Sequence, residues 1–144
     1  MKLSENFTLE ELTHSDVATK FKIKNEPNEE QKDNLKRLCT DILQPIREEY
    51  GFPITVTSGY RNVNVNNKVK GSKTSQHIKG QAADITCNDT TKAFLFDLIK
   101  KMIEEGKIKV GQLIWEYGTK KEPKWIHVSL PYTKTNQILY FYSK

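Results

Sequence analysis

The sequence feature that most constrains the fold is an apolar stripe of helical period in the first half of the chain. Six residues follow the i, i+3, i+4, i+7 spacing of one helix face: Leu35, Leu38, Cys39, Ile42, Leu43 and Ile46. Asn28 and Gln31 form a capping box at the start of this helix, Pro45 predicts a kink near its end, and Gly51 is a natural stop. A helix with one apolar face needs a second layer to cover it, which the rest of the chain must supply.

From residue 54 onward, short β-branched and alternating segments predict strands at 54–57, 82–86, 112–116, 125–130 and 137–142. We also predict a short helix at 9–13 that begins at Thr8, an irregular surface segment at 14–26, and a helix at about 91–105 capped by Asp89 or Thr90. Residues 59–76 are polar and predict a long loop, and loops of that length are usually functional. The expected class is α+β, with a mostly antiparallel sheet and the N-terminal helices packed on one of its faces, in a single domain over residues 1–144.

Charge and hydropathy exclude several classes of partner. The chain of 144 residues has 23 Lys and Arg against 18 Asp and Glu, a net charge of +5, but the two signs are interleaved. Because no basic run of five occurs, we expect no specific nucleic-acid partner. No apolar run approaches the ~20 residues of a membrane span, so we expect no membrane partner. The chain has only two cysteines, Cys39 and Cys87, which are too few for a disulfide scaffold or a thiolate zinc site. We also expect the protein to be a monomer.

Two of the three histidines and one aspartate form the candidate site. Asp84 lies in a strand of small and apolar residues, where a buried carboxylate is costly unless it is paired. His77 ends the polar loop, and Gly80 lets the chain turn so that both side chains can point at one centre. His127 alternates with Trp125 and Ser129 on one face of its strand. Two histidines, one carboxylate and an open position match a catalytic zinc site, although a structural histidine and a capped aspartate would satisfy the same pattern.

The spacing of these residues resembles a known family. Ser75-x-His77-x-x-Gly80-x-Ala82-x-Asp84, then Trp125-Ile126-His127, with Ser58-Gly59-Tyr60-Arg61 upstream, is similar to the zinc D-Ala-D-Ala carboxypeptidases and their relatives. Those relatives include phage peptidoglycan endopeptidases and the hedgehog signalling domain, and the resemblance spans residues 7–130.

The resemblance implies a fold of the hedgehog and D-Ala-D-Ala-peptidase type with one zinc ion per chain. It implies that His77, Asp84 and His127 are the zinc ligands, and that Arg61 holds substrate or stabilises an oxyanion. Ser75 would orient substrate or cap the loop, and Trp125 could form a wall of the cleft.

The general base departs from the pattern of the family. Many relatives place an acid three residues before the last histidine, and that position is Lys124 here. If strands 112–116 and 125–130 form a hairpin, position 116 opposes 125 and 114 opposes 127, which puts Glu116 on the face of His127. Glu122, in the connecting loop, is the second candidate.

The predicted function is hydrolysis of peptide bonds in bacterial cell-wall peptidoglycan, as a D-Ala-D-Ala carboxypeptidase or an L-Ala-D-Glu or cross-link endopeptidase, for example as a phage or prophage lysin. The alternative is a non-catalytic zinc-containing module of the same fold, which binds the cell wall or serves in a phage structure; Lys124 keeps that alternative open. Residues 1–6 lack the apolar stretch of a signal peptide, so we expect a protein that is cytoplasmic until released, or virion-associated if phage-encoded.

Overall fold

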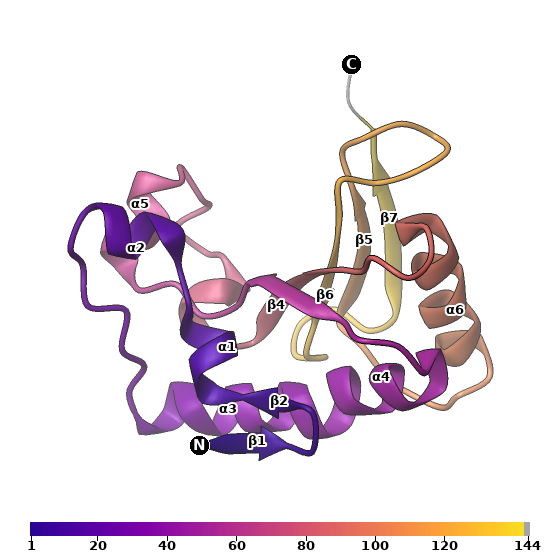
Figure 1. Ribbon diagram of the computed structural model, residues 1–144, viewed down its shortest axis with the longest axis horizontal. Coiled ribbons are helices and arrows are strands. Elements are labelled where there is room, and N and C mark those ends of the chain that lie inside the picture. Colours follow the sequence, from indigo (N-terminus) through magenta and orange to yellow (C-terminus); the bar gives the residue numbers. More distant parts are fainter. Residues whose placement is uncertain (143–144) are drawn as a thin grey trace.

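The computed structural model describes residues 1–142 and contains two sheets (Figure 1). A small N-terminal hairpin joins β1 (Lys2–Ser4) to β2 (Phe7–Thr8). The main sheet has the strand order β3-β4-β6-β5-β7. Its strands are β3 (Thr55–Ser58), β4 (Ala82–Thr86), β5 (Gln112–Glu116), β6 (Trp125–Ser129) and β7 (Gln137–Phe141). All five predicted strands are therefore present, within a residue or so of their predicted ends.

The mixture of helices and strands is confirmed, but two details of the predicted class need correction. The sheet is mixed, because β7 runs parallel to β5 while the other three pairs are antiparallel. The segment after β6 crosses back over the sheet end, where the Asn136 and Gln137 amides donate to the Val110 and Gly111 carbonyls, so that β7 starts beside the start of β5. The helices are also not confined to the N-terminal half, since two α-helices, over residues 63–68 and 92–104, lie between strands of the main sheet. The last two residues of the predicted domain, 143–144, lie outside the described residues.

The predicted long helix is a rod made of α3 (Glu29–Leu38), a π-helical turn η1 (Cys39–Leu43) and α4 (Gln44–Tyr50). The capping box of Asn28 and Gln31 is confirmed, and Gly51 ends the rod in a left-handed conformation. The kink expected from Pro45 is present as the π-helical turn η1, which directly precedes the start of α4. A wider π turn accommodates a residue that lacks an N–H and whose ring would clash with the preceding turn.

The shorter helices were predicted less well. The helix α1 (Leu9–Thr13) begins at Thr8 as expected, but α2 (Asp16–Lys20) was not predicted. The predicted loop 59–76 contains α5 (Val63–Lys68) and leads into a 3₁₀ turn, η2 (Gln76–Lys79). The helix α6 (Lys92–Glu104) is capped by Thr91 rather than by Asp89 or Thr90. Helices of five or six residues have too few turns to show a helical period, so they are hard to recognise in sequence.

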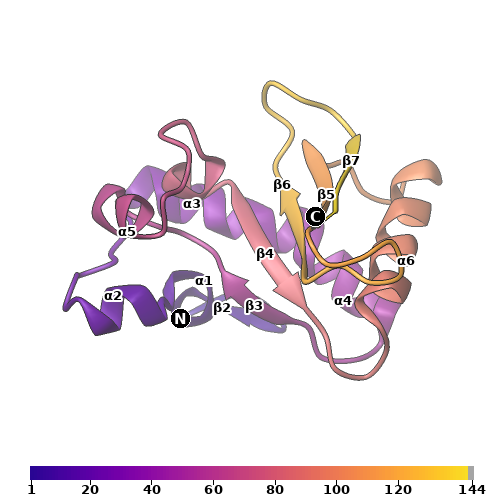
Figure 2. The same ribbon diagram turned by 90° about the horizontal axis from the view of Figure 1, so that it is seen from above.

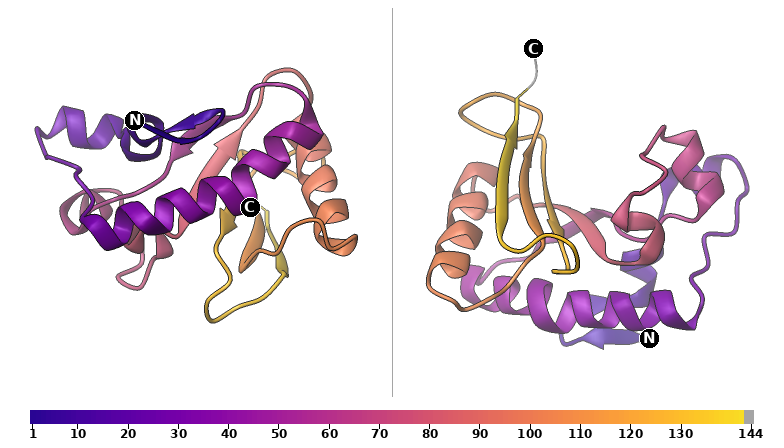
Figure 3. Two further views of the ribbon diagram at one scale, coloured as in Figure 1. Left: turned by 90° about the horizontal axis from the view of Figure 1, so that it is seen from below. Right: turned by 180° about the vertical axis from the view of Figure 1, so that it is seen from behind.

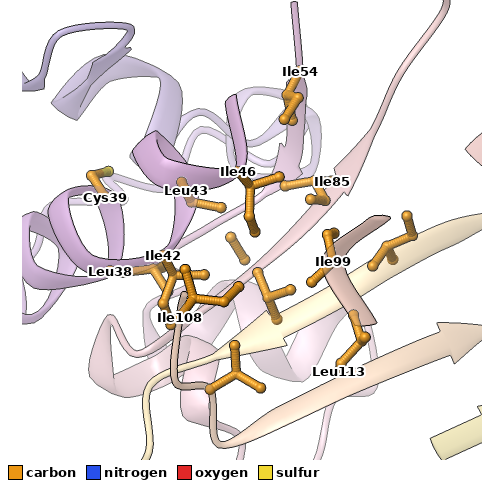
Figure 4. Close-up of a cluster of buried hydrophobic side chains, with 14 of the residues drawn as sticks. Leu38, Cys39, Ile42, Leu43, Ile46, Ile54, Ile85, Ile99, Ile108 and Leu113 are labelled. Atoms are coloured by element: carbon orange, nitrogen blue, oxygen red, sulfur yellow. The ribbon is translucent and has the colours of Figure 1, made fainter. Parts of the chain in front are cut away.

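The hydrophobic core lies between the helical rod, α6 and one face of the main sheet (Figures 2 and 3). Figure 4 shows the side chains of this layer, with Leu38, Ile42 and Ile46 from the rod against Ile85 of β4 and Leu113 of β5. Ile99 of α6 completes the cluster. Within residues 1–142, no helix has the length and apolar character needed to cross a lipid bilayer.

The opposite face of the sheet carries the candidate site. Asp84 pairs with His127, and His127 pairs with Ile114, so these three residues form one row across β4, β6 and β5. Glu116 pairs with Trp125 in a neighbouring row. Because side chains alternate along a strand, both rows point away from the core face.

Gly80 joins the 3₁₀ turn to β4, and the requirement for glycine at this position can be tested. Its φ is +73°, and a Cβ there would lie 2.6 Å from the Gln31 carbonyl oxygen, whereas Gly106 has φ +74° with nothing within 4 Å of a Cβ. We expect Gly106→Ala to lower the free energy of unfolding by roughly 1–2 kcal/mol, the cost of a left-handed alanine. Gly80→Ala should cost a further ~1–3 kcal/mol because of the clash. Urea unfolding measures the free energy of unfolding of the two variants. An equal loss of stability in both would contradict the prediction.

Candidate metal centre

His77 sits in the 3₁₀ turn that precedes β4. The Ser75 hydroxyl caps this turn by accepting the His77 backbone N–H at 3.2 Å, so the capping alternative predicted for Ser75 is what the structure shows. Gly80 ends the turn, and the Gln81 amide donates back to the Gln76 carbonyl. The residue His77 is 3% exposed, so its side chain is held rigidly at the base of the site.

A backbone carbonyl sets the orientation of the His77 ring. The ring Nδ1 lies 2.7 Å from the Gly59 carbonyl oxygen, which can only accept, so Nδ1 carries the proton. Nε2 is then the nitrogen that faces the carboxylate, and it lies 3.4 Å from Asp84 Oδ1. A ligand histidine whose other nitrogen donates to a carbonyl is the usual outer-shell arrangement of a metal site.

Asp84 and His127 meet as a cross-strand pair of β4 and β6. His127 Nδ1 lies 3.0 Å from Asp84 Oδ1, and both residues are 9% exposed. Burial by itself would raise the pKa of the Asp84 carboxyl. The charge of His77 and the hydrogen bond to His127 outweigh burial and hold that pKa well below its usual range. Asp84 is therefore an ionised, buried carboxylate that needs positive charge around it.

These three side chains fit a zinc ion. Their ligand atoms all lie within 4.8 Å of one another. Zinc bonds of ~2.0–2.1 Å at a tetrahedral angle place two ligand atoms about 3.3 Å apart. The Asp84 oxygen lies 3.4 Å from one imidazole nitrogen and 3.0 Å from the other, which matches this spacing. The donor set of two imidazoles and one carboxylate is one that zinc takes in catalytic sites.

Gly59 is a positioning residue whose role the sequence pattern did not reveal. Its carbonyl orients His77, and a Cβ at this position would lie 2.3 Å from the Leu12 carbonyl oxygen. The next residues are anchored too, because the Tyr60 amide donates to Leu12 and the Arg61 amide donates to the His77 carbonyl. Only a glycine lets this segment approach α1 closely enough to hold the histidine ring.

Arg61 lies beside the three candidate ligands, and one of its donor atoms has no partner among the described residues. It lines a cavity of about 570 Å³ together with His77, Asp84 and His127. One guanidinium nitrogen, Nη2, donates to the Ser75 hydroxyl at 3.3 Å, while Nε is buried and has no partner among the described residues. Burial lowers the pKa of the Arg61 guanidinium and the Asp84 charge opposes that shift, but an arginine stays protonated. Arg61 can therefore take a carboxylate or carbonyl oxygen in the cavity.

The predicted register of the hairpin formed by β5 and β6 is confirmed. Glu116 opposes Trp125, Ile114 opposes His127, and both Glu116 and Trp125 line the same cavity. Burial raises the pKa of the Glu116 carboxyl, with His127 opposing and Asp84 adding to the shift. Glu122 does not line this cavity, because its carboxylate accepts the backbone N–H and the ammonium of Lys92 at 3.1 and 3.2 Å.

The walls of the cavity include residues that the sequence did not single out. Tyr117 and Phe141 stand beside Trp125 on one side, with the Tyr117 and Trp125 rings 5.4 Å apart. Residues 69–72, which follow α5, form the other side. Phe141 reaches the cavity through the parallel pairing of β7 with β5, which places it next to Glu116. A sequence pattern of alternating residues cannot show that pairing.

The remaining histidine and the cysteines do not line this cavity. His14 is exposed and pairs with Asp16 at 3.0 Å. Cys39 and Cys87 are buried free thiols, and burial raises the pKa of Cys39 to about 12.

Comparison with known proteins identifies the family. The model of the family described as Peptidase M15 matches residues 5–129, most of the chain. The chain thus belongs to the M15 peptidases, the zinc D-Ala-D-Ala carboxypeptidase and hedgehog-like family, whose peptidases depend on zinc. No curated protein matches the chain.

We predict one zinc ion per chain at this centre. Replacing His77 with alanine removes a ligand, so zinc affinity should fall by at least about a hundredfold, since even outer-shell partners contribute 10–100-fold. His14→Ala, an exposed histidine bonded only to Asp16, is the matched control and should keep its zinc. The zinc content of both variants after dialysis, measured by mass spectrometry, tests this prediction. Stoichiometric zinc in His77→Ala would show that the ligand set is different.

Proposed function

We propose that this protein is a zinc-dependent peptidase that hydrolyses peptide bonds in bacterial cell-wall peptidoglycan. One observation carries the proposal: the His77–Asp84–His127 cluster opens into a cavity that also holds the half-buried carboxyl of Glu116 and the guanidinium of Arg61. A metal site, an acid–base group and a fixed positive charge around one cavity are what amide hydrolysis requires.

Each residue has a role that follows from its position. When bound, zinc would supply a Lewis acid that lowers the pKa of a water towards 7 and polarises the scissile carbonyl. Glu116 accepts the proton of the attacking water and passes it to the leaving amine, and its raised pKa favours the first of these transfers, because it makes the carboxylate a stronger base. Glu116 can do this because it shares the strand face of His127.

Arg61 supplies the charge that holds substrate. Its side chain contacts Ser75, whose hydroxyl also caps the turn of His77, so the guanidinium is tied to the same turn as a metal ligand. The guanidinium lines the cavity, where it can donate to a carbonyl oxygen or a carboxylate of the bound peptide. Trp125, Tyr117 and Phe141 offer apolar contact to substrate on the other side of the cavity.

The choice of peptidoglycan rests on the family and on charge. The net charge of +5 favours the anionic polymers of the bacterial wall. Phage or prophage origin, release from the cytoplasm and a monomeric state remain predictions that go with this proposal.

The competing proposal is a zinc-containing binding module without catalysis. Lys124 replaces the acid that many relatives carry three residues before the last histidine. The backbone N–H of Lys124 donates to the Glu116 carbonyl at 3.0 Å. Lys124, at the position where relatives carry the acid, therefore lies next to a glutamate on the neighbouring strand. This favours an enzyme whose acid has moved to the partner strand.

The test is digestion of purified peptidoglycan and soluble muropeptides by the zinc-loaded protein, followed by mass spectrometry. We expect new peptide ends, loss of cleavage with a chelator, and recovery when zinc is added. No cleavage by protein that carries stoichiometric zinc would favour the binding module.

Glu116→Gln preserves size and hydrogen bonding but removes the proton acceptor. We expect turnover to fall by about a hundredfold or more, the usual scale of general-base catalysis, with zinc content unchanged. Glu122→Gln is the matched control from the same hairpin and should be nearly silent, because that side chain bonds to Lys92. Steady-state hydrolysis of one muropeptide compares the two. The reverse outcome would assign the base to the loop.

Arg61→Lys keeps the charge but loses the planar fork of donors. If Arg61 contributes about 1.5–4 kcal/mol through paired hydrogen bonds, kcat/KM should fall by roughly ten- to a thousandfold. Arg47→Lys, on α4 and outside the cavity, should have no effect. Unchanged turnover in Arg61→Lys would show that Arg61 does not hold substrate.

A further inference from the structure

Lys70 lines the cavity of the metal centre in a backbone conformation that lysine rarely adopts. It follows the end of α5 with a φ of +57°, in the left-handed region. That region is costly for any residue that has a side chain, and glycine is the usual residue there at the end of a helix. The same cavity holds His77, Asp84 and His127. None of the roles assigned above uses Lys70.

Two hydrogen bonds at the end of α5 hold this conformation. The Lys70 amide donates to the Asn67 carbonyl at 3.2 Å, and the Gly71 amide donates to the Asn66 carbonyl at 2.9 Å. This pair of bonds is the Schellman motif, in which the left-handed residue is most often glycine. The end of α6 has the same pair of bonds with glycine, Gly106, at the left-handed position. The end of α5 therefore places a cation where the backbone alone would favour glycine.

The cavity wall that carries Lys70 is tied to the turn of the metal ligand His77. Asn66 is 1% exposed, and its side-chain amide donates to the Ser72 carbonyl at 3.0 Å. The same carbonyl accepts the Ser75 amide at 3.0 Å, and the Ser75 hydroxyl caps the turn of His77. The backbone of Lys70 is therefore fixed relative to the metal centre, while its side chain is exposed.

The charge of Lys70 is not neutralised within the described part of the chain. No carboxylate among residues 1–142 forms an ion pair with it. Residues 51–83, which include this wall, contain one arginine and four lysines but no aspartate or glutamate. The carboxylates that line the cavity are Asp84, which belongs to the metal cluster, and Glu116, the proton acceptor. An anion that enters the cavity therefore meets an unpaired cation on this wall.

We propose that Lys70 is a specificity-determining residue that binds a carboxylate of the peptide substrate. A lysine is then kept at a position that suits glycine because its ammonium is needed in the cavity, as strained residues at functional sites often are. The inference rests on the proposed peptidase function and names the substrate group that one wall of the cavity recognises. That carboxylate belongs either to the carboxyl end of the peptide or to an acidic residue within it, and the experiment separates these two sources.

Four versions of one muropeptide test the inference, with a free or an amidated carboxyl end and with an internal glutamate or glutamine. Zinc-loaded Lys70→Gln should lose about two- to fivefold in kcat/KM on peptides with the recognised carboxylate, the scale of an exposed ion pair. The loss should lie in KM, because such a contact binds substrate and transition state alike, and it should vanish on the peptide that lacks that carboxylate. Lys70→Arg should keep the preference. No loss, or an equal loss on all four peptides, would overturn the inference. No cleavage by the parent protein would instead overturn the proposed peptidase function.

Lys22 is a matched control for the backbone effect. It follows α2 with a φ of +55° in the same hydrogen-bonded motif, made with the Thr19 and Ala18 carbonyls, but it does not line the cavity. Glycine relieves the left-handed strain at either position, so Lys70→Gly and Lys22→Gly should each raise the midpoint of thermal unfolding by about 1–4 °C. Lys70→Gly should lose the preference for the carboxylate, and Lys22→Gly should keep it. Loss of the preference in both variants, or in neither, would overturn the role of Lys70.

Discussion

The contact on which the rest of the site depends is the cross-strand pair of Asp84 and His127. A carboxylate in a strand of alanine and isoleucine is costly to bury unless positive charge surrounds it. The two histidines lower the pKa of that carboxyl, but an imidazole that donates to Asp84 cannot also offer the same nitrogen to a metal. A bound zinc ion would resolve this conflict, because one cation can accept lone pairs from all three side chains at the observed spacing. The fold thus buries a set of donors that a metal ion would compensate.

The division of the sheet into two faces explains how such a polar cluster coexists with a dry core. Leu113, Val128 and Ala83 form one row on the core face, and their neighbours Ile114, His127 and Asp84 form the next row on the site face. A slip of one residue in any of these strands would exchange the two faces and bury the histidine and the aspartate among helices. The hydrophobic packing of the helical rod therefore specifies the register that brings the metal ligands together, so stability of the core and geometry of the site are linked.

Sequence patterns predicted the parts of the structure that depend on local or antiparallel neighbours. The capping box at Asn28, the strand of Asp84 and the hairpin that places Glu116 near His127 follow from periodicity and short connections. The short helices α2 and α5 were missed because single side-chain caps, Ser15 and Asn62, carry little signal without a helical period. Trp125 was predicted as a wall of the cavity, but Tyr117 and Phe141 beside it were not, for another reason. Phe141 reaches the site through a parallel pairing after a crossover, and Gly59 acts through its carbonyl, which no side-chain pattern records.

The two glutamates of the β5–β6 hairpin show how one loop separates a chemical role from a structural one. The hairpin turn is tight, because Tyr117 has a left-handed φ of 58° and a Cβ on Gly118 would lie 2.2 Å from the Glu122 carbonyl oxygen. Non-glycine residues stay in that conformation only where their surroundings hold them. Here the Tyr117 amide donates to the Phe141 carbonyl, and the Glu122 carboxylate ties the loop to Lys92 at the start of α6. Glu122 thereby stabilises the turn that presents Tyr117 and Trp125 to the cavity, while Glu116, on the strand itself, stays free to face the metal ligands. An acid in the loop would have to break its anchor to reach the metal, and the acid on the strand already lies on the correct face.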